Sequence, residues 1–118
     1  MNLTHDEMKL ILDTTLDTMA EMLTEITKAQ LMVWRLGTLK NEGKVTPQQV
    51  SMAKRNSVHM ALEVARNARQ IHGAMGITGE YSIMRHMMNL ESVLTYEGTH
   101  DIHLLITGHD ITGISAFE

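Results

Sequence analysis

The sequence holds 118 residues, enough for one domain with a single core and too few for a separate substrate-binding lobe. Hydrophobic residues make up 43% and charged residues 20%, which favours a folded chain, and the absence of cysteine excludes disulfides, thiolate metal sites and cysteine nucleophiles. The formal net charge of -4 excludes a basic nucleic-acid interface, and no apolar run approaches the roughly 18 residues of a membrane span.

The first predicted helix begins at Thr4 and ends before Gly43. Thr4 and Glu7 have the spacing of a capping box, and glycine is a common residue just beyond a helix end. Apolar residues between these limits recur at steps of three and four, so we expect them on one inward face. They are Met8, Ile11, Leu12, Met19, Met22, Leu23, Ile26 and Val33.

A second helix is predicted from Thr46 to about His72. Thr46, Pro47 and Gln49 combine a hydroxyl cap, a proline in the first turn and an amide at the capping-box position. The small residues of its inner face allow a neighbouring helix to approach closely. That face is Val50, Ala53, Ser57, Met60, Ala61, Val64, Ala68 and Ile71.

Two shorter helices complete the pattern. The third is expected from Ser82 to about Leu94, and Thr99 is expected to cap the fourth, with Asp101 in its first turn. No segment alternates with the two-residue period of a strand. The sequence therefore predicts an all-α fold, an antiparallel up-and-down helical bundle over residues 1–118.

Two segments interrupt the helices, residues 70–78 and residues 95–103. Both fall at helix ends, where free backbone groups and exposed side chains can meet a ligand. Considered separately, the first is typical of a glycine-terminated helix followed by a turn. The second, considered separately, is typical of a solvated carboxylate, Glu97, before a glycine.

The fourth helix also carries a pair of potential metal ligands. His100 and His103 lie one helical turn apart, with Asp101 between them. No third ligand is evident from the sequence, so we expect no metal site.

Together and in this order, the two segments resemble the C-terminal helical domain of the acyl-CoA dehydrogenases, most closely the glutaryl-CoA dehydrogenase branch. The resemblance runs from Leu16 to Phe117. The sequence departs from that branch at His109, where an arginine is usual. The matching motifs are Lys54-Arg55-Asn56, residues 61–66, Arg85-His86, Asn89-Leu90-Glu91, residues 95–103 and Ile111-Thr112-Gly113.

The resemblance implies a flavin enzyme in which a carboxylate removes the α-proton of an acyl-CoA thioester while hydride leaves the β-carbon for FAD. The carboxylate position matches Glu97, and an apolar pocket beside Tyr96 would raise its pKa toward the range of a general base. Gly98 would let the backbone approach the substrate thioester. The backbone N–H of Glu97 would help hold the thioester oxygen.

The resemblance also assigns two groups of FAD contacts. One group is at the start of the fourth helix, at Thr99 and Asp101, where free backbone N–H groups can meet phosphate or ribityl oxygens. The other contacts the cofactor of a neighbouring subunit in related enzymes, and the family's paired glycines there are replaced by Gly73-Ala74. This second group is Gln70, Ile71, His72, Gly73 and Ala74.

Family members also have an N-terminal helical domain and a middle β-domain, which form most of the pocket and which this sequence does not contain. We therefore expect the chain alone neither to retain FAD nor to oxidise an acyl-CoA. Two arrangements stay open for a catalytic role: completion by a complementary N-terminal chain, or a sequence that is a fragment of a longer enzyme. The alternative is a non-catalytic helical oligomerisation module. Either function predicts a homodimer or homotetramer, because the bundle should expose apolar surface. Without a signal or transit pattern, we expect a cytoplasmic location, or the mitochondrial matrix in a eukaryote.

Overall fold

The computed structural model describes residues 2–116, so Phe117, where the resemblance ends, lies outside the described residues. Four α-helices and one short 3-10 helix occur in this part of the chain, and no strand does. Their bounds are α1 His5–Asn41, α2 Pro47–Ile71, η1 Gly73–Ile77, α3 Ile83–Thr95 and α4 His100–Thr112. The all-α bundle is confirmed, and the 3-10 helix is an addition to it.

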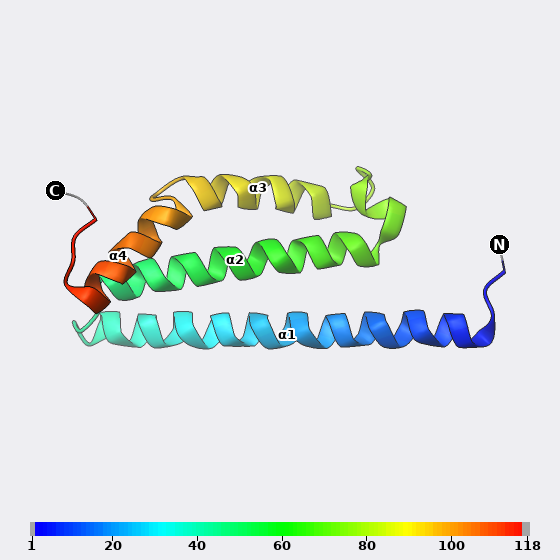
Figure 1. The fold of residues 1–118 in the computed structure, drawn as a ribbon, viewed down its shortest axis with the longest axis horizontal. Helices are drawn as coiled ribbons and strands as arrows, with labels where there is room; N and C mark the ends of the chain where they lie inside the picture. The colour runs from blue at the N-terminus through cyan, green and yellow to red at the C-terminus, as the bar shows by residue number, and fades with distance from the viewer. Residues whose placement is uncertain (1, 117–118) are drawn as a thin grey trace.

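Helix α2 is the centre of the arrangement. It lies between α1 on one side and α3 on the other, and α4 passes from the end of α3 to the first turns of α2 (Figure 1). The molecule measures 61 × 26 × 25 Å and has a radius of gyration of 18.6 Å. A compact domain of this length would have a radius of about 13 Å, so the bundle is elongated.

The helix starts follow the predicted capping signals. The hydroxyl of Thr4 accepts the N–H of Glu7 at 3.2 Å, and the Glu7 carboxylate accepts the N–H of Thr4 at 2.8 Å. The same reciprocal pair joins Thr46 and Gln49 at the start of α2. Hydrogen bonds from the Thr4 backbone and hydroxyl lower the pKa of Glu7, because they favour its ionised form.

The inward face predicted for α1 is wrong at six positions. Met8, Ile11, Leu12, Met19, Leu23 and Val33 are half or more exposed, whereas Met22 and Ile26 are partly buried as expected. The helix is apolar on more than one side and only α2 packs closely on it, so periodicity alone did not identify the packed side. Residues that face α2 include Ala29, which is 2% exposed, and Met32 and Leu36.

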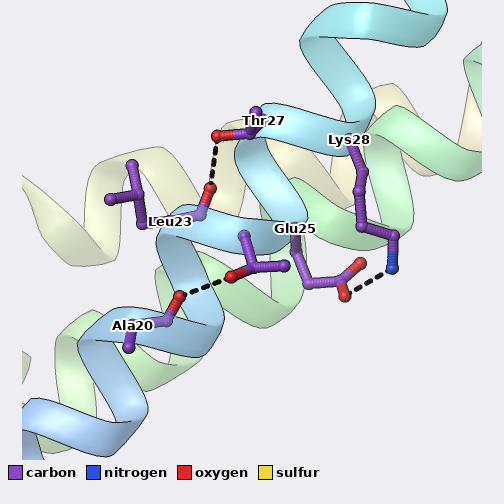
Figure 2. A network of polar contacts seen from close by, with 6 residues as sticks. Ala20, Leu23, Glu25, Thr27 and Lys28 are labelled. Carbon is purple, nitrogen blue, oxygen red and sulfur yellow. Dashed lines mark hydrogen bonds and ion pairs between the residues drawn. The ribbon is translucent and has the colours of Figure 1, made fainter.

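Threonines on α1 satisfy their hydroxyl groups within the helix. Thr27 donates to the carbonyl of Leu23 at 2.8 Å, and Lys28 pairs with Glu25 at 2.7 Å on the same stretch (Figure 2). Thr24 donates in the same way to the carbonyl of Ala20. Because each of these hydroxyls donates its one proton within the helix, it can offer a neighbouring molecule only an acceptor oxygen. No helix in residues 2–116 is both long enough and apolar enough to cross a membrane.

Two different stripes of α2 are covered, which the single predicted face did not anticipate. Ala53 is buried as expected, but Val50 and Ile71 are exposed. Val58 and Leu62, which the prediction missed, are 7% and 3% exposed. The reason is that α2 contacts α1 on one side and α3 and α4 on the other, so its two sides need separate apolar stripes.

Candidate active site

The loop between α3 and α4, residues 96–99, is fixed at both ends by helix caps. Tyr96 ends α3 and donates its N–H to the carbonyl of Ser92 at 3.0 Å. Thr99 begins α4, and its hydroxyl accepts the N–H of Ile102 at 3.3 Å. The predicted cap is confirmed, and the loop that carries Glu97 has little freedom at its ends.

The middle of the loop has an unusual backbone. Glu97 has a φ angle of 59° and Gly98 has a φ angle of 91°. Glu97 is the one non-glycine residue with positive φ in the described part of the chain. A side chain in that region costs about 1–2 kcal/mol. The surroundings must therefore hold Glu97 in this conformation.

Two side chains from other helices meet this loop. The Nζ of Lys54, on α2, donates to the carbonyl oxygens of Tyr96 and Gly98. The buried ring of His103, on α4, packs against Gly98. The loop is therefore supported from the central helix and from the helix that follows it.

The carboxylate of Glu97 is free. Glu97 is exposed, and within residues 2–116 it forms no hydrogen bond or ion pair. Tyr96 is 54% exposed, so the apolar pocket expected beside it is not formed by this part of the chain. The described residues supply the loop and the carboxylate, and leave the space around them open.

The other candidate segment ends α2. Its helix terminates at Ile71, and Gly73 has a φ angle of 55°, as expected for a glycine helix end. The next turn is 3-10 and buries Gly76 against the backbone carbonyl of Arg69. The predicted FAD contacts here are all exposed: Gln70, Ile71, His72, Gly73 and Ala74.

The two candidate cofactor segments lie at opposite ends of α3 (Figure 1). Helix α3 has 13 residues, which corresponds to about 20 Å along its axis. Thr99 and Asp101 are therefore close to Glu97, whereas Gln70 and its neighbours are far from it. The structure brings the predicted substrate and base residues together with one group of predicted FAD contacts and separates them from the other group.

The histidines of α4 are the potential metal ligands noted in the sequence. Within residues 2–116, no group of three His, Cys, Asp or Glu side chains is placed to hold a metal ion. His103 is 9% exposed, and neither of its ring nitrogens has a hydrogen-bond partner there. His100 instead lies near His59, with ring centres 6.2 Å apart.

Lys54 is the site residue to which the sequence analysis assigned no role. It belongs to a motif of the resemblance, yet the motif gave no indication of what the side chain contacts. The available signal was its position in the helix, since Lys54, Val58 and Leu62 recur every four residues. That spacing places Lys54 on the side of α2 that meets α3 and α4.

Comparisons with known proteins agree with this geometry. The family model for the C-terminal domain of acyl-CoA dehydrogenase matches residues 12–112. Glutaryl-CoA dehydrogenase from Mycobacterium smegmatis has a similar structure, with a TM-score of 0.89 and 46% identity over 99% of this chain and 30% of that one. A structure of a glutaryl-CoA dehydrogenase from M. smegmatis in complex with FADH2 has a TM-score of 0.86 and 45% identity over 90% of this chain and 28% of that one.

Curated relatives include acyl-CoA dehydrogenases. The short-chain specific enzyme of Megasphaera elsdenii is 34% identical over 90 residues, which are 76% of this chain and 24% of the relative. The mitochondrial short-chain specific enzyme of Homo sapiens is 34% identical over 77% of this chain and 22% of the relative. The chain thus spans about a quarter of the length of the curated relatives it matches.

Proposed function

Because the chain belongs to the acyl-CoA dehydrogenase family, we propose that it is the base-carrying domain of a flavin-dependent enzyme that oxidises acyl-CoA thioesters. In this proposal Glu97 removes the α-proton of the substrate. The observation that carries it is the exposed, unpaired carboxylate of Glu97 on a loop fixed by two helix caps. A base must be held in place and still be free to accept a proton.

The loop also supplies groups that would orient the thioester. Within residues 2–116, the N–H of Glu97 has no hydrogen-bond acceptor. It would donate to the thioester oxygen and stabilise the negative charge that develops there during proton removal. Gly98 has no side chain to block the approach of the substrate, and the ring of Tyr96 would cover one side of the acyl chain.

The two exposed segments suit a flavin nucleotide. The first turn of α4, at Thr99 and Asp101, has backbone N–H groups without partners in the helix, which favour phosphate and hydroxyl oxygens. Around Gly73 there is open space, so a ligand can approach the backbone. When bound, FAD would accept the hydride that leaves the β-carbon. We propose that Gln70 through Ala74 contact the FAD of a neighbouring copy, because they lie far from Glu97.

We further propose glutaryl-CoA as the substrate. The support is 46% identity to the M. smegmatis glutaryl-CoA dehydrogenase over nearly the whole chain. Oxidation would give glutaconyl-CoA, which can lose CO2. Protonated Glu97 would then give its proton to the carbanion that remains after the loss of CO2. Other acyl-CoA thioesters of similar size should be compared with glutaryl-CoA as substrates in the assay described next.

A chimera tests the role of Glu97. The segment of the M. smegmatis enzyme that this chain matches, 30% of that chain, would be replaced by the present sequence. We expect glutaryl-CoA to reduce an electron-accepting dye in the chimera. Glu97→Gln should lower the rate about 10²–10⁴-fold, because a general base contributes that much, and should leave the flavin absorbance unchanged. Glu80→Gln, at another exposed glutamate, is the matched control.

An unchanged rate in the Glu97→Gln chimera would contradict the proposal. A second measurement does not depend on hydride transfer: exchange of the substrate α-protons with deuterated water follows proton removal alone. Exchange should be lost in Glu97→Gln and retained in Glu80→Gln.

The alternative function, a non-catalytic oligomerisation module, is favoured by a different observation. Exposed apolar residues line α1, among them Leu10, Leu31 and Trp34, which are 68%, 60% and 70% exposed. Such a surface favours self-association. We expect the purified chain to be colourless, inactive with dyes and oligomeric. Dye reduction by the chain alone, or a monomer in light scattering over a range of concentrations, would contradict these expectations.

A further inference from the structure

We propose that Lys54 is a positioning residue that holds the loop of Glu97 in the conformation required for proton removal. This inference rests on the proposed role of Glu97 as the base. Lys54 itself contacts backbone oxygens and no reacting atom, so its effect would act through the loop.

Lys54 contacts the two residues that flank Glu97 in the sequence. Its Nζ donates to the carbonyl oxygen of Tyr96 and, at 2.6 Å, to the carbonyl oxygen of Gly98. These carbonyls belong to the residues immediately before and after Glu97. One ammonium group therefore holds the peptide group that precedes Glu97 and the peptide group that follows Gly98, so the short segment that carries the base is fixed at both ends.

The loop needs such a contact because of its backbone. With φ angles of 59° and 91° at Glu97 and Gly98, the chain follows a path that an L-residue rarely adopts. This path brings two carbonyl oxygens within hydrogen-bonding distance of one point, where their partial negative charges repel each other. A cation at that point converts the repulsion into two charge-assisted hydrogen bonds, which are stronger than neutral ones.

The position of Lys54 on α2 suits this role. Val58, one turn further along the same side, is 7% exposed and anchors that part of α2 against α3 and α4. The Nζ of Lys54 also lies 5.9 Å from the centre of the Tyr96 ring. Within residues 2–116, Lys54 forms no ion pair with a carboxylate. The charge of its ammonium group is therefore directed to the loop.

The first experiment measures the mobility of the loop in the 118-residue chain by ¹⁵N relaxation. In the wild-type chain we expect order parameters of about 0.85 at the amides of Glu97 and Gly98. Lys54→Met keeps most of the length of the side chain and removes the charged ammonium group, and it should lower these values below about 0.6. Lys9→Met, an exposed lysine on α1, is the matched control and should leave them unchanged. Unchanged order in Lys54→Met would overturn the proposal.

Chemical rescue separates the ammonium group from the bulk of the side chain. Because the chain has no cysteine, Lys54→Cys introduces a single thiol. Alkylation of that thiol with 2-bromoethylamine creates a side chain with an amine at nearly the same distance, whereas a propyl group restores only the bulk. We expect the amine to restore loop order and the propyl group to fail. Equal restoration by both groups would show that packing is sufficient and would overturn the proposal.

A measurement on the wild-type chain covers the case in which the variants do not fold. The three Nζ protons of Lys54 should exchange slowly with water, because two of them are hydrogen-bonded to carbonyls, whereas those of Lys9 should exchange rapidly. Rapid exchange at Lys54 would overturn the proposal.

The chimera tests whether the two hydrogen bonds from Lys54 to the loop, called the clamp below, affect catalysis. Lys54→Met should lower kcat about tenfold or more with a smaller change in KM, and Lys9→Met should change neither. The NMR readouts need no turnover, so the two proposals can fail separately. If Glu97→Gln retains activity while Lys54→Met disorders the loop, the base assignment is wrong and the clamp stands. If the loop stays ordered in Lys54→Met while Glu97→Gln is inactive, the clamp is wrong and the base assignment stands.

Discussion

The ring of His103 lies so close to Gly98 that a methyl group added at Gly98 would be 2.9 Å from the ring Nε2. His103 is 9% exposed and is held among residues of α2, α3 and α4, which limits how far the ring can move aside. The positive φ of Gly98 adds a second restriction, because any L-residue would be strained there.

Gly98→Ala should therefore destabilise the chain by about 1–3 kcal/mol. Urea unfolding followed by circular dichroism measures this change. Gly108→Ala is the matched control, since Gly108 is within α4 and a methyl group there would meet no atom within 4 Å. It should stabilise the chain by about 0.5–1 kcal/mol, the usual gain from alanine in a helix. Equal effects of the two substitutions would contradict the steric and backbone argument.

A similar contrast is expected in the turn after α2. A methyl group at Gly76 would collide with the backbone carbonyl of Arg69, and backbone atoms cannot move aside as the end of a flexible side chain could. Gly76→Ala should cost about 1–3 kcal/mol of unfolding free energy, as overpacking usually does. Gly79→Ala meets open space and should change it by less than about 0.5 kcal/mol. Thermal melts of both variants are sufficient, and a fully stable Gly76→Ala would refute the close approach of η1 to α2.

The start of α4 depends on a hydroxyl group. Thr99→Ala removes the acceptor for the N–H of Ile102 and should cost about 1 kcal/mol, whereas Thr99→Ser keeps the acceptor and should cost much less. Amide hydrogen exchange at Ile102 is the measurement, with faster exchange expected in the alanine variant alone. If the serine and alanine variants behave alike, the cap is not what holds this end of the loop.

The start of α1 should depend on pH through Glu7. Hydrogen bonds from the Thr4 backbone and hydroxyl hold the pKa of Glu7 below its ordinary value of 4.5. A lowered folded-state pKa means that the stabilisation is present above the unfolded-state pKa and is lost as pH falls through the folded-state value. NMR titration of the Glu7 side-chain carbon should give the lowered pKa, with fraying of the first turn over the same range.

Glu7→Gln is the control for this titration. Glutamine retains an oxygen that can accept the N–H of Thr4 but has no carboxyl group to protonate. The first turn of α1 should therefore lose its pH dependence below pH 4.5 in this variant. Persistence of the same transition would assign it to another group.

The ends of the helices could be predicted from sequence more readily than their packed sides. Thr4, Thr46 and Thr99 cap their helices as expected, because a cap is a contact between residues three apart in the chain. Packed sides depend on how many neighbours a helix has. Helix α1 has one close partner and α2 has several, so a single apolar stripe described neither, and Leu23 was expected inside yet is 65% exposed.

The candidate site shows the same contrast: neighbours in the sequence could be predicted together, whereas a contact between distant residues could not. Glu97, Tyr96 and Gly98 were named from a contiguous motif, and the structure places them on one loop between two caps. Lys54 received no role because its partners are backbone carbonyls 42 and 44 residues away, and a carbonyl group is common to every residue. Contacts of this kind become visible only when the helices are in place.

The same separation has a consequence for how a preparation of this protein should be judged. Each helix can form from local contacts, but the loop of Glu97 acquires its ammonium support only after α2 has docked against α3 and α4. A chain in which all helices have formed but α2 has not docked against α3 and α4 would give a native-like circular dichroism spectrum. Its loop at Glu97 would still be unorganised. Helical content therefore measures the amount of secondary structure, whereas the environment of Lys54 reports whether the loop of Glu97 has been assembled.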